Sequence, residues 1–263
     1  MINEIMSLNP IFQALIAGLF TYGITILGAS LVLFMKKINK TFMDSMLSLA
    51  AGIMIAASFF SLILPAINTL EELNMVKWFP LSIGFMLGGI FLYFGNKIYE
   101  LKSKNKNDTR IKRSALIILS ITLHNIPEGM AVGVAFGSIL YGIKGASLLS
   151  AWLIALGIGL QNFPEGSAVS IPLRREGFSR KKAFFLGQLT GIVEPISSVI
   201  GAVLVMKVRF LMPLLLSFAA GAMIYVVTME LIPESQTNKK KDLMAIFTII
   251  GFTIMMFLDI TLG

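Results

Sequence analysis

The sequence predicts an all-α membrane protein with eight transmembrane helices, and three observations support this fold class. Of the 263 residues, 56% are hydrophobic and 14% are charged, whereas about 25% are charged in ordinary soluble domains. Apolar segments of roughly 20 residues, long enough to cross about 30 Å of hydrocarbon as a helix, recur along the chain. Basic residues concentrate in alternate loops between these segments, as the positive-inside rule describes.

Eight apolar segments have the required length. The first is too long for the core of a signal peptide and no small-residue cleavage pattern follows it, so we expect it to remain as a membrane helix. We expect residues 1–263 to form a single transmembrane domain. The predicted spans are 11–35, 42–67, 78–99, 114–139, 146–172, 183–206, 210–233 and 243–262.

The distribution of basic residues predicts the orientation of these helices. Eighteen of the 22 Lys and Arg residues follow spans one, three, five and seven, and the other four are Lys77, Lys144, Lys207 and Arg209. The odd-numbered loops are therefore expected in the cytoplasm and both termini outside. The polar stretch at about 100–113 is expected to be a mobile cytoplasmic linker. The net charge of +8 then reflects orientation and anionic lipid headgroups, and it does not indicate a nucleic-acid partner.

Two hexapeptides of one pattern lie inside spans four and five: H-N-I-P-E-G at residues 124–129 and Q-N-F-P-E-G at residues 161–166. In each, the first residue and the glutamate are four positions apart and share one helical face, while the asparagine is rotated by about 100°. The proline cannot donate to the carbonyl four residues earlier, so both helices are expected to kink beside a polar cavity. The motifs lie at matching depths and can meet mid-membrane.

Acidic residues inside the spans indicate a cation site. An unpaired glutamate at the bilayer centre costs several kcal/mol, and the basic residues lie in loops, so bound cations or protons must compensate the charge. The nitrogen and oxygen donors beside two of the glutamates suit a divalent transition metal, and the chain has no cysteine to add thiolates. We therefore favour a metal site over a proton relay. The acids are Glu128, Glu165, Glu194, Glu230 and Asp259, and the neighbouring donors are His124, Asn125, Gln161 and Asn162.

Span six adds a third candidate carboxylate. Glu194 lies in G-Q-L-T-G-I-V-E-P, where Pro195 and the glycines at 187 and 191 favour a kink and close helix approach. Three glutamates could neutralise one divalent ion, or most of the charge of two. For Glu230 and Asp259 a functional role, protonation, an interfacial position and a hydrogen bond to a serine all remain open.

Small residues at helical spacing predict close helix contacts. Gly84 and Gly88, like Gly187 and Gly191, fit contact surfaces either within the subunit or between protomers. A homodimer is therefore left open.

With these motifs the chain resembles the Zrt/Irt-like (ZIP) metal transporters, in particular the bacterial GufA-like branch, over nearly its whole length. The similarity extends to A-S-F-F-S-L-I-L-P at 57–65, V-E-P at 193–195 and E-L-I-P-E at 230–234. It implies helices arranged as three, two and three, with the outer triplets related by inversion, and sliding of one bundle against the other. It also implies uptake of a divalent metal into the cytoplasm, with zinc first and cadmium, iron(II) or manganese as alternatives.

The resemblance further implies a binuclear site and a path to it. Gln161 stands where many family members have a second histidine and Asn162 where some have aspartate, so the preferred metal and the second ion stay open. Ser58 and Glu230 would line the path. The first ion would lie near His124, Glu128, Gln161 and Glu165, and the second near Asn125, Glu128, Asn162, Glu165 and Glu194.

Three functions fit the sequence. The first is a carrier of divalent metal ions through a midplane site, a multi-pass protein of the bacterial inner membrane that changes no bond of its substrate and needs no prosthetic group. The second is a proton-coupled carrier or channel for another cation or solute that uses the same carboxylates. The third, an intramembrane metalloenzyme, is disfavoured because such sites usually hold two or three histidines and this chain has one.

Overall fold

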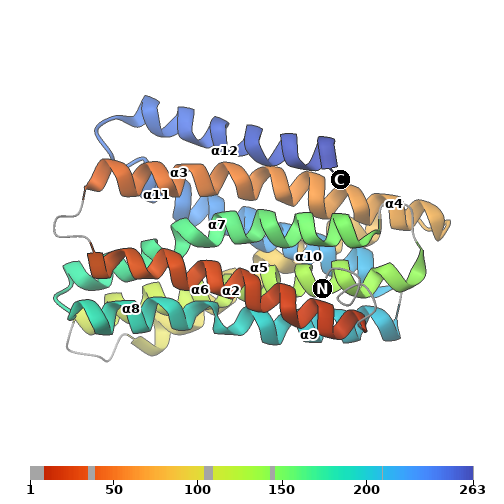
Figure 1. Cartoon of the computed structure of the whole chain (residues 1–263), viewed down its shortest axis with the longest axis horizontal. Helices are drawn as coiled ribbons and strands as arrows, with labels where there is room; N and C mark the ends of the chain where they lie inside the picture. The colour runs from red at the N-terminus through yellow and green to blue at the C-terminus, as the bar shows by residue number, and fades with distance from the viewer. Residues whose placement is uncertain (1–8, 35–38, 104–108, 143–145, 209, 263) are drawn as a thin grey trace.

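The computed structural model describes residues 9–34, 39–103, 109–142, 146–208 and 210–262, and all of its regular elements are helices. The predicted all-α class is confirmed (Figure 1). The α-helices are α2 (Pro10–Phe34), α3 (Lys40–Ala57), α4 (Leu64–Glu72), α5 (Trp78–Ser103), α6 (Thr109–Ser138), α7 (Leu148–Arg175), α8 (Arg180–Leu189), α9 (Val193–Lys207), α10 (Leu211–Val226), α11 (Ile232–Ser235) and α12 (Lys241–Leu262). Shorter segments are η1 (Ser58–Ile63), η2 (Ile139–Tyr141), η3 (Thr190–Ile192) and η4 (Val227–Leu231).

Six helical segments of the described chain are long and apolar enough to cross a membrane, and each overlaps a predicted span over most of its length. They are Pro10–Phe34, Lys40–Glu72, Trp78–Ile98, Arg180–Lys207, Leu211–Ser235 and Lys241–Thr261. Helices α6 and α7 occupy predicted spans four and five but fall outside this group. They contain the two hexapeptides.

The described helix ends next to the basic loops gather at one end of the bundle. The end of α7 and the starts of α3, α8 and α12 lie on the left of Figure 1, and α2 begins and α12 ends on the right. The linker predicted at 100–113 is shorter than expected, because α5 continues to Ser103 and α6 begins at Thr109. Some predicted loop charges lie outside the described residues, namely Lys36, Lys37, Lys104, Lys106, Lys144 and Arg209.

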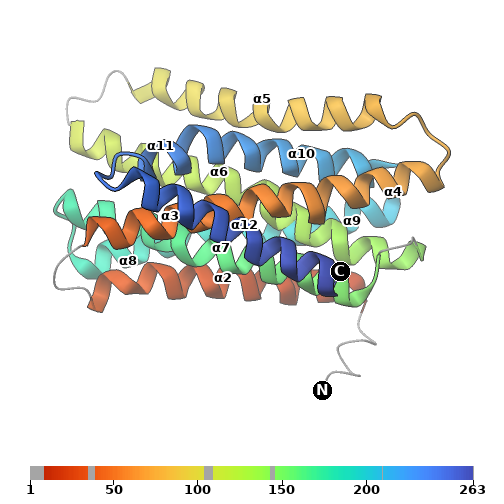
Figure 2. The same cartoon turned by 90° about the horizontal axis from the view of Figure 1, so that it is seen from above.

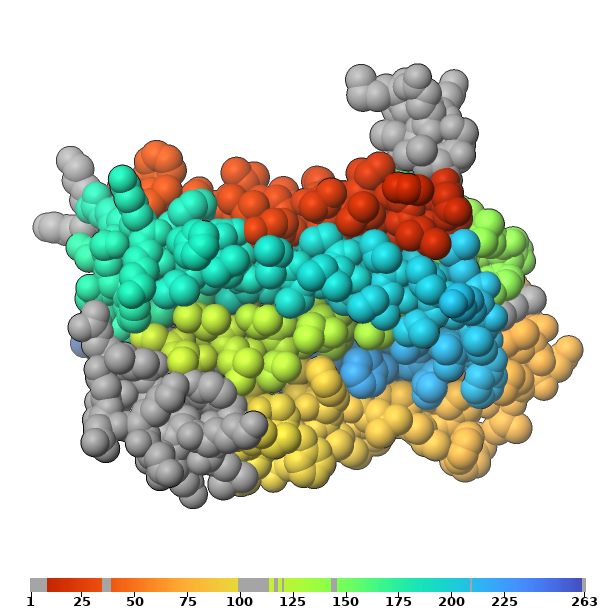
Figure 3. Space-filling view, turned by 90° about the horizontal axis from the view of Figure 1, so that it is seen from below, coloured from red at the N-terminus to blue at the C-terminus, as the bar shows by residue number. Residues whose placement is uncertain are grey.

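Helices α5 and α12 are the least buried of the six apolar segments. Only 22% of the apolar window of α5 and 17% of that of α12 are buried, against 67% for Lys40–Glu72. Their exposed side chains include Leu87, Phe94, Ile249 and Phe257, as expected of surfaces that face hydrocarbon. In Figure 2, α5 lies at one edge of the bundle and α2 at the other. Figure 3 shows α2, α8–α9, α6 and α5 as adjacent bands on one face.

Reciprocal glycines bring four helix pairs into close contact. Between α2 and α7, a Cβ at Gly28 would overlap the carbonyl oxygen of Phe163, and one at Gly166 would overlap that of Thr25. Without a side chain at these positions, the backbones can approach each other closely. Three other pairs are built in the same way: α6–α9 with Gly133 and Gly201, α5–α10 with Gly88 and Gly221, and α3–α12 with Gly52 and Gly251.

The glycines predicted to mark helix contacts all face helices of the same chain. Gly84 and Gly88 contact α10, Gly187 contacts α7, and Gly191 contacts Thr25 on α2. Of the two alternatives left open by the sequence, the structure therefore shows contacts within the subunit.

Regular α-helix is interrupted at places that the prolines of the hexapeptides did not predict. The helices α6 and α7 continue through Pro127 and Pro164. In η1 and η4 the backbone is instead π-helical, and the amides of Leu64 and Ile232 bond to carbonyls five residues earlier. Such π segments are frequent at functional sites. Near Pro195, where a kink was predicted, the 3₁₀ turn η3 separates α8 from α9.

Candidate metal centre

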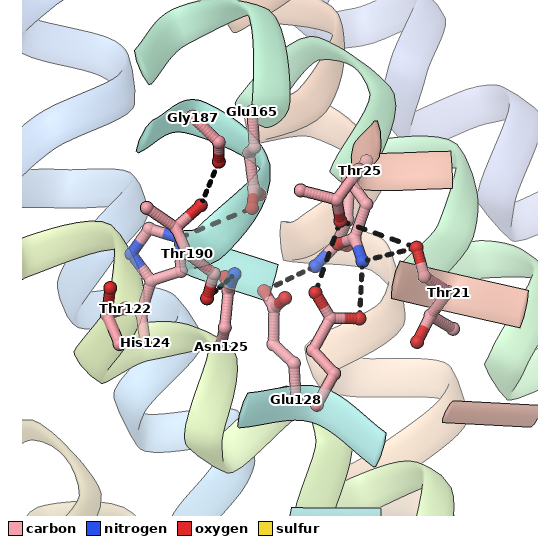
Figure 4. Close-up of polar contacts among 12 residues, drawn as sticks. Thr21, Thr25, Thr122, His124, Asn125, Glu128, Glu165, Gly187 and Thr190 are labelled. Atoms are coloured by element: carbon pink, nitrogen blue, oxygen red, sulfur yellow. Dashed lines mark hydrogen bonds and ion pairs between the residues drawn. The ribbon is translucent and has the colours of Figure 1, made fainter. Parts of the chain in front are cut away.

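Helices α6 and α7 bring the two hexapeptides together, as predicted. Nε2 of His124 lies 3.2 Å from Oε2 of Glu165, and Nε2 of Gln161 donates a 2.6 Å hydrogen bond to Oε1 of Glu128. The first residue of each motif therefore contacts the glutamate of the other motif. All four side chains are at most 2% exposed, and Figure 4 shows His124, Glu128 and Glu165 among them.

Each polar residue of the two hexapeptides keeps one buried atom without a hydrogen-bond partner among the described residues. An unpartnered buried polar atom costs about 1–3 kcal/mol, so six of them in two adjacent motifs need a physical explanation. All six can accept, provided that the His124 proton is on Nε2, the nitrogen that faces Glu165. The atoms are Nδ1 of His124, Oδ1 of Asn125, Oε2 of Glu128, Oε1 of Gln161, Oδ1 of Asn162 and Oε1 of Glu165.

Hydrogen bonds fix the orientation of the two asparagine amides. Nδ2 of Asn125 donates to the carbonyl of Thr190 at 3.0 Å, and Nδ2 of Asn162 donates to Oε2 of Glu194 at 2.7 Å. Turning either amide over would place an oxygen against an oxygen. The amide oxygens are therefore the atoms left available to a cation.

Glu194 lies beside the two motifs and is fully buried. Besides the bond from Asn162, its Oε1 accepts a hydrogen bond from the hydroxyl of Thr25 at 3.2 Å. Nδ2 of Asn162 also donates to the carbonyl of Thr21 at 3.3 Å. The contribution of α2 was not predicted from the sequence, since a threonine in an apolar helix carries no signal of its own.

The side-chain atoms that could bind a metal ion here belong to several chemical groups. In the part of the chain that the structure describes, no three His, Cys, Asp or Glu side chains are grouped closely enough to hold a metal ion. The acceptors that converge here are instead carboxylates, amides and one imidazole. Closed structural zinc sites use four Cys or His ligands, so a mixed oxygen-rich set is better suited to an ion that binds and leaves.

A cavity of about 280 Å³ lies near the site, between the ends of α4, α6, α7, α10 and α12. Ala135 and Ile154 in its wall are seven residues from Glu128 and Gln161, which is about 10 Å along a helix axis. The ends of these helices lie on the side opposite the basic loops (Figure 1).

Asp259 also lines this cavity, together with Ser61. Both carboxylate oxygens of Asp259 accept from the hydroxyl of Ser61, at 2.8 and 3.0 Å. Among the alternatives left open for this acid, the hydrogen bond to a serine is therefore present.

The two residues predicted to line the path both lie at π segments. The hydroxyl of Ser58, the first residue of η1, donates to the carbonyl of Met54 at 2.7 Å. Glu230 lies in η4 and is partly buried. Ser58 and Glu230 therefore lie where the α-helix is interrupted, and not next to the hexapeptides in sequence.

One buried acid was missed in the sequence analysis. Asp44, near the start of α3, is fully buried. Its Oδ2 lies 3.4 Å from Nζ of Lys40 and accepts a 2.7 Å hydrogen bond from Asn238. A partner cation at the helix end thus compensates this carboxylate, in contrast to those at the centre.

Comparison with known proteins identifies clear relatives. A family model described as ZIP Zinc transporter matches residues 96–259. Zinc transporter ZIP11 of Homo sapiens is 35% identical, over 97% of this chain and 98% of the relative. Zinc transporter ZIPB of Bordetella bronchiseptica is 35% identical over 95% of this chain and 81% of the relative. Zinc transporter GufA of Myxococcus xanthus is 34% identical over 95% and 98%.

Proposed function

Because the chain belongs to the ZIP zinc transporter family, we propose that it imports divalent transition-metal ions, zinc first, into the cytoplasm. It is a multi-pass protein of the cell membrane. The names of its relatives support zinc as the substrate. Cadmium, iron(II) and manganese are further candidates, and the excess of oxygen over nitrogen donors in the proposed site favours manganese among these three.

The observation that carries the proposal is the set of six unpartnered acceptors in the hexapeptides. A divalent ion between α6 and α7 would satisfy them and would balance the charges of Glu128 and Glu165. A proton could neutralise a carboxylate, but it would leave the amide oxygens of Asn125, Gln161 and Asn162 without a partner. The proton-coupled alternative for another solute is therefore less well supported than metal transport.

The proposed architecture has eight transmembrane helices in one domain, with both termini outside. The outer triplets would be α2, α3–α4 and α5, and α8–α9, α10–α11 and α12, with α6 and α7 at the centre. The placement of a π segment in the second helix of each triplet, followed in both cases by a proline, supports an inverted repeat. The basic residues at one end of the bundle support the orientation.

The proposed motion is sliding of one helix bundle against the other. Within the group α2, α6, α7 and α9, backbone atoms of neighbouring helices lie against Gly28, Gly133, Gly166 and Gly201. Within the group α3, α5, α10 and α12, they lie against Gly52, Gly88, Gly221 and Gly251. Between the groups, Gly95 faces the side chain of Leu123 and Gly157 that of Met255. Flexible side chains can adjust during sliding, whereas interlocked backbones cannot.

The route outward from the site would pass through the 280 Å³ cavity. Asp259 would supply a negative charge in its wall, and Ser58 and Glu230 would lie along the path at the π segments. An ion moving from the cavity to Glu128 would cross about 10 Å between α6 and α7.

Zinc uptake into proteoliposomes that contain a fluorescent zinc reporter tests the proposal. Glu128→Gln removes one charge with little change in volume, and we expect the initial rate to fall at least tenfold, the equivalent of about 1.4 kcal/mol. Glu234→Gln, at an exposed position in α11, is the matched control and should transport normally. Uptake that persists unchanged in Glu128→Gln would reject the proposed site.

A further inference from the structure

The three central carboxylates differ in how their oxygens are used. Glu128 and Glu165 each keep one oxygen without a hydrogen-bond partner among the described residues. Both oxygens of Glu194 accept hydrogen bonds, Oε1 from Thr25 at 3.2 Å and Oε2 from Asn162 at 2.7 Å. Two donors offset the charge of a buried carboxylate, so Glu194 has less need of an ion than its neighbours.

Thr25 is held in place by its surroundings. It is 1% exposed, and a Cβ at Gly191 would come within 3.0 Å of its side chain. The carbonyl oxygen of Thr25 lies against Gly166, the last residue of the second hexapeptide. Its hydroxyl has two acceptors within reach, Oε1 of Glu194 at 3.2 Å and the carbonyl of Thr21, one turn earlier in α2, at 3.3 Å.

Asn162 reinforces this arrangement from the other side. Its Nδ2 group has two acceptors, Glu194 at 2.7 Å and the carbonyl of Thr21 at 3.3 Å. An N–H group cannot ligate a cation, so a metal ion that approached Glu194 from this side would have to displace both hydrogen bonds. An aspartate at position 162 would present oxygens there instead.

We propose that the hydrogen bonds from Thr25 and Asn162 keep Glu194 from binding the transported ion, so that the centre binds one divalent ion and not two. The inference rests on the proposed function, and it assigns Thr25 as a positioning residue for Glu194. The single ion would be held by acceptors of the hexapeptides, and the remaining negative charge would reside on Glu194, stabilised by its two donors.

The number of zinc ions bound per chain tests this inference. Full-length protein in detergent is titrated with zinc by isothermal calorimetry, and the bound metal is counted by mass spectrometry. The wild type is expected to bind one ion. Asn162→Asp is expected to bind two, because a carboxylate replaces the donor that faces Glu194. Thr25→Val, which replaces the hydroxyl with a methyl group of similar size, should add a weaker second binding step.

Thr122→Val is the matched control, since the hydroxyl of Thr122 bonds to Ile118 within its own helix at 2.7 Å. This variant should still bind one ion. Thr25→Val keeps the test decisive if the new buried acid of Asn162→Asp prevents folding. Two ions in the wild type, or one ion in every folded variant, would overturn the inference and leave the proposed function intact. A wild type that binds no zinc would instead reject the proposed function.

Discussion

The amide of Gln161 donates a 2.6 Å hydrogen bond to the carboxylate of Glu128, and His124 makes the equivalent contact with Glu165 at 3.2 Å. Each hexapeptide thus supplies the partner of the glutamate in the other one. The two contacts differ in length and in the head group, which is imidazole on α6 and amide on α7. Gln161 is therefore the position at which this chain departs from a symmetric pair of motifs.

Gln161→His is expected to make the centre more selective for zinc. Imidazole favours zinc, while manganese favours oxygen donors, so we expect the Kd for zinc to fall by about tenfold, or about 1.4 kcal/mol, with little change for manganese. Competition titration against a zinc indicator measures both constants. The reciprocal variant His124→Gln should shift the ratio of the Kd for zinc to the Kd for manganese in the opposite direction. If neither substitution changes this ratio, positions 124 and 161 do not bind the metal.

Zinc should stabilise the folded protein through Glu128 and Glu165. At free zinc a hundredfold above Kd, a single site adds about 2.7 kcal/mol of stability, which should raise the Tm by several degrees. The double variant Glu128→Gln/Glu165→Gln should lose this shift. Without metal it should melt no lower than the wild type, because unpartnered buried charges destabilise the native state. Thermal unfolding in detergent with a chelator, and then with zinc, gives both comparisons.

Asp259 is expected to assist entry of the ion rather than to bind it at the centre. Asp259→Asn should raise the KM for uptake, roughly tenfold at low ionic strength, with kcat unchanged. The effect should shrink in about 1 M salt, where the Debye length is about 3 Å. Ser61→Ala removes the hydrogen bond and keeps the charge, so it should leave the salt dependence as in the wild type. A fall in kcat for Asp259→Asn would place this acid in the transport step itself.

The close crossing of α2 and α7 predicts different effects for two glycines of one helix. A Cβ at Gly28 would overlap the carbonyl oxygen of Phe163, whereas a Cβ at Gly23 would meet no other helix of the described chain within 4 Å. Gly28→Ala should lower the free energy of unfolding by about 1–3 kcal/mol. Gly23→Ala should raise it by up to about 1 kcal/mol, because alanine favours the helix. Equal unfolding midpoints for the two variants in denaturant would show that α2 and α7 do not pack in this way.

Much of this arrangement follows from the sequence, because it depends on local pattern. Hydropathy identifies the helices, and a spacing of four residues places His124 and Glu128 on one face of α6. The repetition of the motif on the next helix then predicts that the two faces meet. The contacts between His124 and Glu165 and between Gln161 and Glu128 confirm this prediction.

The features that the sequence did not predict depend on the register between distant helices. Thr25 lies 169 positions from Glu194, and nothing in its neighbourhood marks it as a donor to a buried carboxylate. The π segments η1 and η4 carry no mark in the sequence, and the prolines of the hexapeptides lie in other helices, α6 and α7. The sequence did not predict the burial of Asp44, because its hydrogen-bond partner Asn238 is distant in the chain and lies in the connection between α11 and α12.

The most direct test of a metal centre between α6 and α7 is anomalous diffraction from crystals of the protein loaded with zinc. We predict a peak about 2.0–2.2 Å from carboxylate oxygens of Glu128 and Glu165, with His124 among its neighbours. Crystals at saturating zinc that show no anomalous peak between these two helices would contradict the proposed function.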